Sequence, residues 1–176
     1  YTGRFNHDVA HGFHKMYPLL GNPDYEPNPE DSIAARAEKE NRDPYEYAYD
    51  VLLANDGRGL IFFPLADFAE HTLDPTYERL NHHGAFWSLS DGGAHCRLIC
   101  DASTSTFMLS HWTRDRTNGP KMKIEDAVKL MTHDTAEIYG LLGDRGTLEV
   151  GKRADINVID YDNLSISAPE MAYDLP

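Results

Sequence analysis

The chain is poor in cysteine and has no long apolar run. Cys96 and Cys100 are the only two cysteines among 176 residues, too few for the disulfide framework of a small secreted domain. Their C-x3-C spacing departs from the C-x2-C pair most typical of zinc sites. No stretch of roughly 18 apolar residues occurs, so no membrane-spanning helix is expected. The polar N-terminus predicts no secretory signal peptide, and reduced thiols fit a cytoplasmic protein.

Positive charge is also scarce. The chain has 16 Lys and Arg against 29 Asp and Glu, which gives a formal net charge of −13. An acidic surface repels phosphate backbones, so nucleic acid is not expected as a partner. Hydrophobic residues still make up 41% of the chain, which excludes a disordered polymer and is enough for a packed core.

Apolar spacing and the positions of Pro and Gly predict an α/β chain. Helices are expected over residues 3–19, 29–41, 43–55, 74–82, 102–112, 124–131 and 135–139. Apolar runs at 59–65 and 85–89 lie on either side of the 74–82 helix, and this order predicts a parallel βαβ unit. Residues 146–160 alternate polar and apolar side chains, which predicts a half-buried strand in a different layer.

The segment Ser90-Asp91-Gly92-Gly93-Ala94-His95 follows the predicted strand 85–89. Gly92 and Gly93 allow a sharp turn or a close approach to a ligand, because they carry no Cβ. A carboxylate at the carboxyl end of a buried strand is typical of catalytic groups in α/β barrels. Asp91 is therefore either a catalytic carboxylate or the cap of a following turn or helix.

Two further stretches resemble the closing signature of the amidohydrolase superfamily. They are the helical segment 132–141, which carries a Thr…Ala…Gly-Leu core, and residues 144–160, which read Asp-Arg-Gly-Thr-Leu…Gly-Lys-Arg-Ala-Asp-Ile-Asn-Val-Ile-Asp. The segments 89–95 and Ser110-His111-Trp112-Thr113-Arg114-Asp115-Arg116 are similar to the N-acyl-D-amino-acid deacylase (D-aminoacylase) branch. The resemblance covers most of residues 20–176.

This resemblance implies the C-terminal part of a metal-dependent (β/α)8 barrel. Residues 1–144 would belong to the barrel, and residues 145–176 would be a segment of a small β-sandwich domain. Asp91 would end the eighth strand, face the catalytic metal, which is usually zinc, and accept a proton from the attacking water. A divalent ion lowers the pKa of bound water, and a carboxylate can pass the proton to the leaving amine. The implied reaction is the deacylation of an N-acyl-D-amino acid or a similar small amide.

Several residues near Asp91 are expected to bind that substrate. Gly92 and Gly93 would approach it through the backbone, and His95 would contact substrate or metal, or instead satisfy a carbonyl in the turn. Arg114 and Arg116 would bind a substrate carboxylate; the alternative is a surface network of these arginines with Asp115. Asp67, after the first predicted strand, would line the same mouth or cap a helix.

The chain departs from the family pattern in what it lacks. The His-x-His of the first barrel strand and the mid-barrel metal ligands are absent, and at most two of eight strands are present. We therefore expect the chain alone to be inactive, with the other zinc ligands supplied by the remainder of the enzyme, another chain or a homo-oligomer.

Two other hypotheses remain open at this stage. The first is that the chain is not part of an enzyme but a catalytically inactive module that serves in assembly. His7, His11 and His14 share one face of the first predicted helix, where they would hold zinc or face solvent or a partner.

Overall fold

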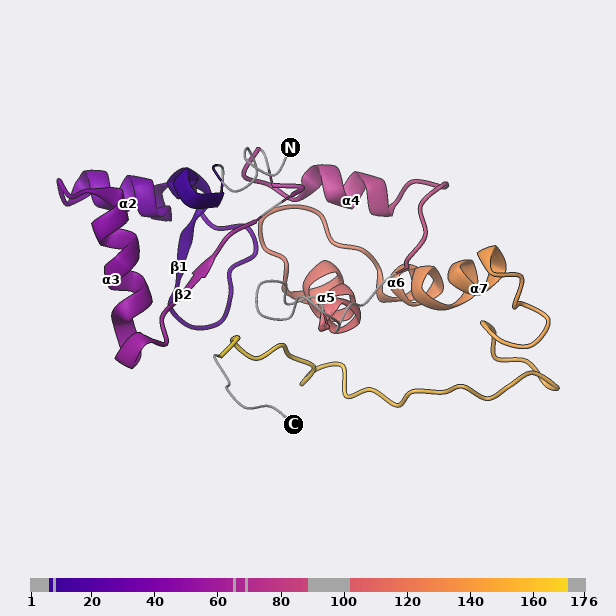
Figure 1. The fold of residues 1–176 in the computed structure, drawn as a ribbon. Coiled ribbons are helices and arrows are strands. Elements are labelled where there is room, and N and C mark those ends of the chain that lie inside the picture. The colour runs from indigo at the N-terminus through magenta and orange to yellow at the C-terminus, as the bar shows by residue number, and fades with distance from the viewer. Residues whose placement is uncertain (1–6, 8, 65, 69, 89–101, 171–176) are drawn as a thin grey trace. The chain divides into compact units, whose positions relative to one another are not determined.

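The computed structural model describes residues 7, 9–64, 66–68, 70–88 and 102–170. They form two compact units, one that runs up to Leu73 and also takes residues from Ser167 on, and one from Asp74 to Ile166. Each unit is described by itself (Figure 1). The boundary between residues 144 and 145, which concerns the domains of a whole enzyme, stays a prediction. No helix in the described ranges is long and apolar enough to cross a bilayer.

The first unit contains the only sheet that the described residues form. Strands β1 (Tyr17–Leu19) and β2 (Leu60–Phe62) pair antiparallel, with Pro18 opposite Ile61. The predicted helix 3–19 is wrong from residue 13 on, because a 3₁₀ turn, η1 (Phe13–Lys15), leads directly into β1. Pro18 lacks the N–H that a helix interior needs. The predicted parallel pairing with residues 85–89 is not seen among the described residues, and β2 pairs instead with β1, in a segment for which the apolar spacing predicted a helix.

The helices of this unit begin at residues that cap them. A 3₁₀ turn, η2 (Pro29–Asp31), precedes α2 (Ile33–Lys39), and the Ser32 hydroxyl accepts from the amide of Ala35 at 3.2 Å. Helix α3 (Pro44–Gly57) follows Asp43, whose carboxylate accepts from the amide of Tyr45 at 2.7 Å. These contacts satisfy amides that a helix N-terminus leaves open, and both predicted helices are confirmed.

Ile33 lies at the centre of the first unit's core. Its side chain is 0% exposed and packs in one cluster with Phe13, Met16 and Ala48. Ile61 and Phe63 cover the cluster from the β2 side. The core therefore joins α2, α3 and the sheet.

The second unit is helical. It contains α4 (Asp74–Leu80), α5 (Thr104–Ser110), α6 (Ile124–Lys129) and α7 (Thr135–Ile138), with π-helical turns η3 (His111–Asp115) after α5 and η4 (Leu130–Asp134) between α6 and α7. The helices predicted over these ranges are confirmed. Thr113 and Thr132 donate their hydroxyls to the carbonyls of Leu109 and Val128, a bond that bends helices. The core of the unit contains Met108, Leu109, Trp112, Met122, Ala127, Leu130 and Ala136.

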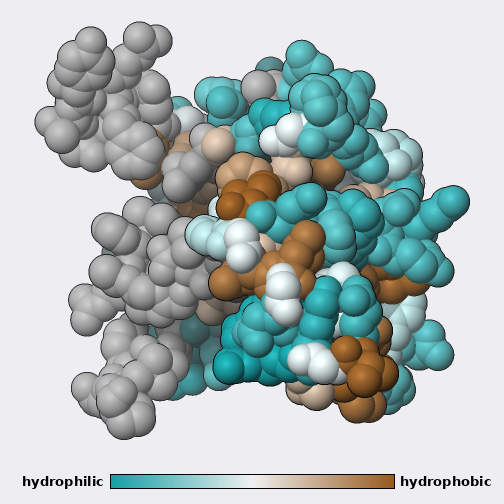
Figure 2. Space-filling model, turned by 90° about the vertical axis from the view of Figure 1, so that its right-hand side faces the viewer, coloured by the Kyte–Doolittle hydropathy of each residue, from teal (hydrophilic) through white to brown (hydrophobic). Residues whose placement is uncertain are grey.

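Two predicted strands do not form. Residues 85–88 and 146–160 have no strand conformation, and the side chain of Val158 is 98% exposed. A strand requires a neighbour for its amides and carbonyls, and neither segment has a neighbouring strand in the described part of the chain. The expected barrel and β-sandwich are therefore not seen among these residues. Figure 2 shows apolar patches lying among hydrophilic side chains on the face that it presents.

The buried position of Ile33 gives a stability prediction. Ile33→Ala should lower the free energy of unfolding by roughly 2–5 kcal/mol, because it leaves a cavity in the cluster. Leu20→Ala, at a side chain that is 77% exposed, should change it by less than about 0.5 kcal/mol. Chemical denaturation measures both variants, and equal losses would contradict the assigned core.

Candidate functional site

The predicted catalytic segment itself lies outside the described residues. This applies to Asp91, Gly92, Gly93 and His95, so their roles stay predictions. The described chain reaches Ser88, and the Thr135 hydroxyl donates to the carbonyl of Trp87 at 2.9 Å. The first residue of α7 thus holds the chain four residues before Asp91.

Arg116 lies inside the second unit and is 1% exposed. Its guanidinium donates to the Asp74 carboxylate at 2.7 Å and to the carbonyls of Asn118 and Pro120 at 3.1 and 3.0 Å. The cation also lies 5.1 Å from the ring centroid of Trp112, a favourable cation–π distance. These contacts connect the end of η3 to the start of α4 and to the loop before α6.

A glycine completes the surroundings of Arg116. Gly119 has a φ of +142°, and a Cβ there would lie 2.6 Å from both the Arg116 guanidinium and the Asp74 carboxylate. The loop therefore approaches the ion pair more closely than other residues allow. The substrate-binding role of Arg116 stays a prediction, and the described contacts already engage both of its terminal nitrogens.

Arg114 extends from η3 toward a different segment. Its guanidinium donates to the carbonyls of Tyr161, Asp162 and Leu164 and to both carboxylate oxygens of Asp115. The hydrogen bond from Arg114 holds the pKa of Asp115 below its ordinary value. The Arg114–Asp115 pair of the alternative network is present, whereas Arg116 is buried and is ion-paired with Asp74. The contacts with residues 161–164 were missed, because carbonyl acceptors leave no signal in a sequence.

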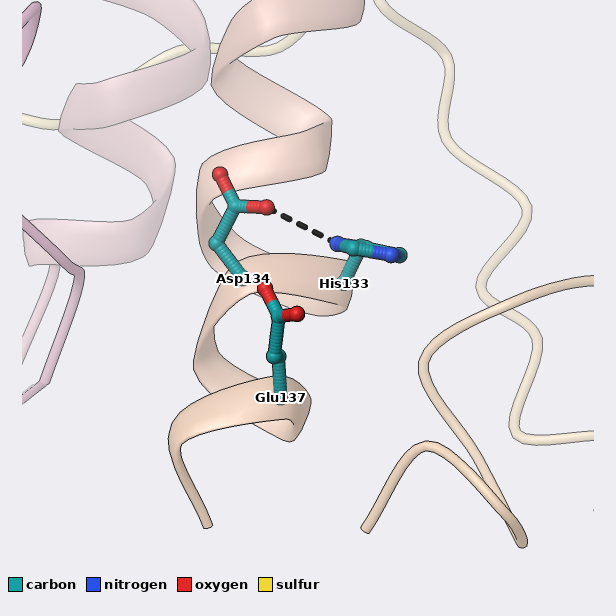
Figure 3. Close-up of side chains that lie close together, drawn as sticks. All are labelled: His133, Asp134 and Glu137. Carbon is teal, nitrogen blue, oxygen red and sulfur yellow. Dashed lines mark hydrogen bonds and ion pairs between the residues drawn. The ribbon is translucent and has the colours of Figure 1, made fainter. Parts of the chain in front are cut away.

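A second group of titratable side chains lies on η4 and α7. His133, Asp134 and Glu137 bring their ligand atoms within 4.8 Å of one another, and Figure 3 shows His133 and Asp134 joined by a hydrogen bond, with Glu137 one turn further on. His133 donates from Nδ1 to Asp134 Oδ1 at 2.8 Å, and Lys129 donates to the same oxygen at 2.5 Å. The Lys129 bond is the main cause that lowers the pKa of Asp134.

This cluster is a poor fit for a catalytic metal. One imidazole and two carboxylates are suitable donors for a divalent cation, and this is the only such group of three in the described ranges. Its central carboxylate, however, is already occupied by the Lys129 ammonium, and Glu137 is exposed. A cation would have to displace that ammonium, so we assign no metal to the cluster.

The remaining candidates lie in the first unit. The rings of His7 and His11 lie 4.2 Å apart, and His11 is hydrogen-bonded to the Tyr45 hydroxyl. His14 lies in η1, and among the described residues the three histidines do not form a metal-ligand group, so the structure does not bring the expected zinc triad together. Asp67 is exposed and has a left-handed backbone, φ 63°. Such a backbone is uncommon outside turns, and α4 begins only at Asp74, so Asp67 does not cap it. Its place at a site mouth stays a prediction.

Most of the chain matches one protein-family profile. The profile described as "Amidohydrolase family" matches residues 46–176. An uncharacterised protein of Mycobacterium tuberculosis (strain ATCC 25618 / H37Rv) is 30% identical over 137 residues, which are 77% of this chain and 22% of that protein. An uncharacterised protein of Mycobacterium bovis (strain ATCC BAA-935 / AF2122/97) matches to the same extent.

A relative with a named activity matches a shorter stretch. Imidazolonepropionase of Agrobacterium fabrum (strain C58 / ATCC 33970) is 32% identical over 78 residues, which are 43% of this chain and 19% of that protein. No solved structure matches. The chain spans about a fifth of the length of the curated relatives it matches.

The buried guanidinium predicts a loss of stability on substitution. Arg116→Gln should lower the free energy of unfolding by roughly 2–3 kcal/mol, because it removes charge-assisted bonds to three acceptors. The matched control is Arg153→Gln, because the Arg153 side chain is exposed and its ion pair with Asp144 is long, at 3.8 Å. This control should lower the free energy of unfolding by less than about 0.5 kcal/mol. Equal losses of stability for the two variants in thermal unfolding would contradict the hydrogen bonds assigned to Arg116.

The lowered pKa of Asp134 predicts a pH dependence. Because the folded-state pKa lies below the ordinary value of about 3.9, the Asp134 carboxylate stabilises the fold above that pH. This contribution is lost as the pH falls through the folded-state pKa. Wild type should therefore exceed Asp134→Asn in unfolding free energy at pH 6, and the difference should shrink as the pH falls below about 3.9. Lys129→Met should remove most of the difference; a difference that grows toward low pH would contradict the assignment.

Proposed function

The chain belongs to the amidohydrolase family, and on that premise we propose that it is part of a hydrolase that cleaves a C–N amide bond in a small molecule. The observation that carries the proposal is the family match over residues 46–176, which includes the Asp91 segment and the helical run 124–138. The match to imidazolonepropionase supports hydrolase chemistry of this class.

The proposed substrate is an N-acyl-D-amino acid or a similar small amide. The support for this finer assignment is the resemblance of residues 89–95 and 110–116 to the D-aminoacylase branch. The acidic chain also disfavours a polyanionic substrate such as nucleic acid, since like charges repel.

Asp91 is the proposed catalytic residue. Its carboxylate would take the proton from the attacking water and deliver it to the leaving nitrogen, so that the amine departs neutral. Members of the superfamily generally bind divalent metals, and a zinc ion held by Asp91 with ligands outside this chain would supply Lewis-acid chemistry. Gly92, Gly93 and His95 would contact the substrate. Arg114 and Arg116 are the weaker candidates for that role, because their described contacts are with protein groups.

The remaining parts of the site would come from outside this chain. The matched region covers 22% of these relatives, and the described residues hold no set of ligands that fits the catalytic metal. We propose that residues 146–160 form their strand only with a neighbour from the rest of the enzyme. The alternating exposed side chains Leu148, Val150, Ile156 and Val158 support this, since an unpaired apolar strand favours pairing.

The complete enzyme gives the test. Asp91→Asn should lower kcat for N-acyl-D-amino acids by about 10²- to 10⁴-fold, because the proton acceptor is lost, and should lower the bound zinc per chain. Asp155→Asn is the control, at an aspartate that is exposed and ion-paired to Arg145 at 3.6 Å.

The same assay separates the enzyme from an assembly module. A wild-type protein that is loaded with zinc and hydrolyses neither N-acyl amino acids nor imidazolone propionate would favour the inactive module. Unchanged hydrolysis and zinc content in Asp91→Asn would exclude Asp91 as the catalytic carboxylate.

A further inference from the structure

We propose that Arg114 is a latch that fastens residues 160–164 to the π-helical turn η3. The latch consists of Arg114 and Thr113 on η3 and of Tyr161, Asp162 and Leu164, at a turn in the segment that follows α7 (Figure 1). This role does not depend on the proposed hydrolytic function.

The contacts between Arg114 and the segment are numerous and directional. One terminal nitrogen donates to the carbonyls of Tyr161 and Asp162, the latter at 3.3 Å, and the other donates to the carbonyl of Leu164 at 2.5 Å. The guanidinium carbon lies 5.4 Å from the ring centroid of Tyr161, within cation–π range. The Thr113 hydroxyl is hydrogen-bonded to the Tyr161 hydroxyl at 2.6 Å. Side chain and backbone of the segment are thus both engaged.

The guanidinium is also held by a neighbour on its own turn, η3. Its Nε and one terminal nitrogen donate to the two oxygens of Asp115 at 2.6 and 2.8 Å, the bidentate geometry that suits a planar fork. Lys121 donates to the backbone carbonyl of Arg114 at 2.5 Å. A group fixed in this way loses little further side-chain freedom when it binds the carbonyls.

The segment is folded so that its carbonyls meet one cation. The amide of Leu164 donates to the carbonyl of Tyr161 at 3.3 Å, and the Asn163 side chain donates to Asp160 at 2.8 Å. This turn brings three carbonyl oxygens toward the same guanidinium, and their dipoles would repel one another without a cation between them. Lysine carries a single ammonium on a flexible stem, so it cannot reproduce the fork.

The latch gives a structural role to part of the segment Ser110–Arg116, for which the proposed chemistry offers only the weaker candidates for substrate contact. A substrate-binding Arg114 would have to release either Asp115 or the carbonyls, because Nε and both terminal nitrogens already donate to protein acceptors. The two roles therefore predict different effects of the same substitution.

Hydrogen exchange on the 176-residue chain tests the latch. In Arg114→Gln, the amide of Leu164 and its neighbours in residues 160–165 should exchange about tenfold to a hundredfold faster than in wild type, because several charge-assisted bonds are lost. Arg114→Lys should lie close to Arg114→Gln rather than to wild type. Arg153→Gln is the matched control, since it removes an exposed arginine of the same unit without touching residues 160–165.

A milder variant covers the case in which Arg114→Gln fails to fold. Tyr161→Phe removes the hydroxyl that is hydrogen-bonded to Thr113 and keeps the ring beside Arg114, and it should speed exchange in the same peptide about threefold to tenfold. Exchange in residues 160–165 that stays at the wild-type rate in every folded variant would overturn the latch. So would a raised KM in the complete enzyme carrying Arg114→Gln, if exchange there is unchanged, because that pattern belongs to a substrate-binding arginine.

Discussion

Positive charge placed against backbone carbonyls is the constraint on which the second unit depends. Arg114 lies on η3 and Arg116 directly follows it, and their guanidinium groups donate to carbonyls of two different stretches, 118–120 and 161–164. Carbonyls in irregular loops lack the partners that helices and sheets supply. In a chain with few regular strands, guanidinium groups take over that task, and the cost of burying Arg116 is offset by its pairing with Asp74.

The helices were predictable because their signals are local. Asp43 before Pro44, and Ser32 before Ile33, set helix starts within the sequence itself, and the structure uses both caps. The strands were not predictable in the same way. Pro18 and its neighbours form β1 because a segment more than 40 residues away supplies the hydrogen bonds. Tertiary contacts of this kind override local periodicity.

Residues 146–160 show the opposite case, a predicted strand that does not form. Their alternation is that of a half-buried strand, yet they form no strand in the described chain, and Val158 remains exposed. The described residues supply no neighbouring strand for this pattern, and we propose that the strand forms with the rest of the enzyme. The same reasoning applies to the site. The sequence marks Asp91 through its motif, whereas the set of ligands needed to complete a metal centre is not found among the described residues.

The position of the metal in the complete protein tests the central claim that Asp91 belongs to the catalytic centre of an amidohydrolase. Anomalous diffraction at the zinc edge would locate the ion directly. The account predicts a peak about 2.0–2.2 Å from a carboxylate oxygen of Asp91, with no peak at His133, Asp134 and Glu137. A fully occupied zinc at that surface cluster, with none beside Asp91, would contradict it.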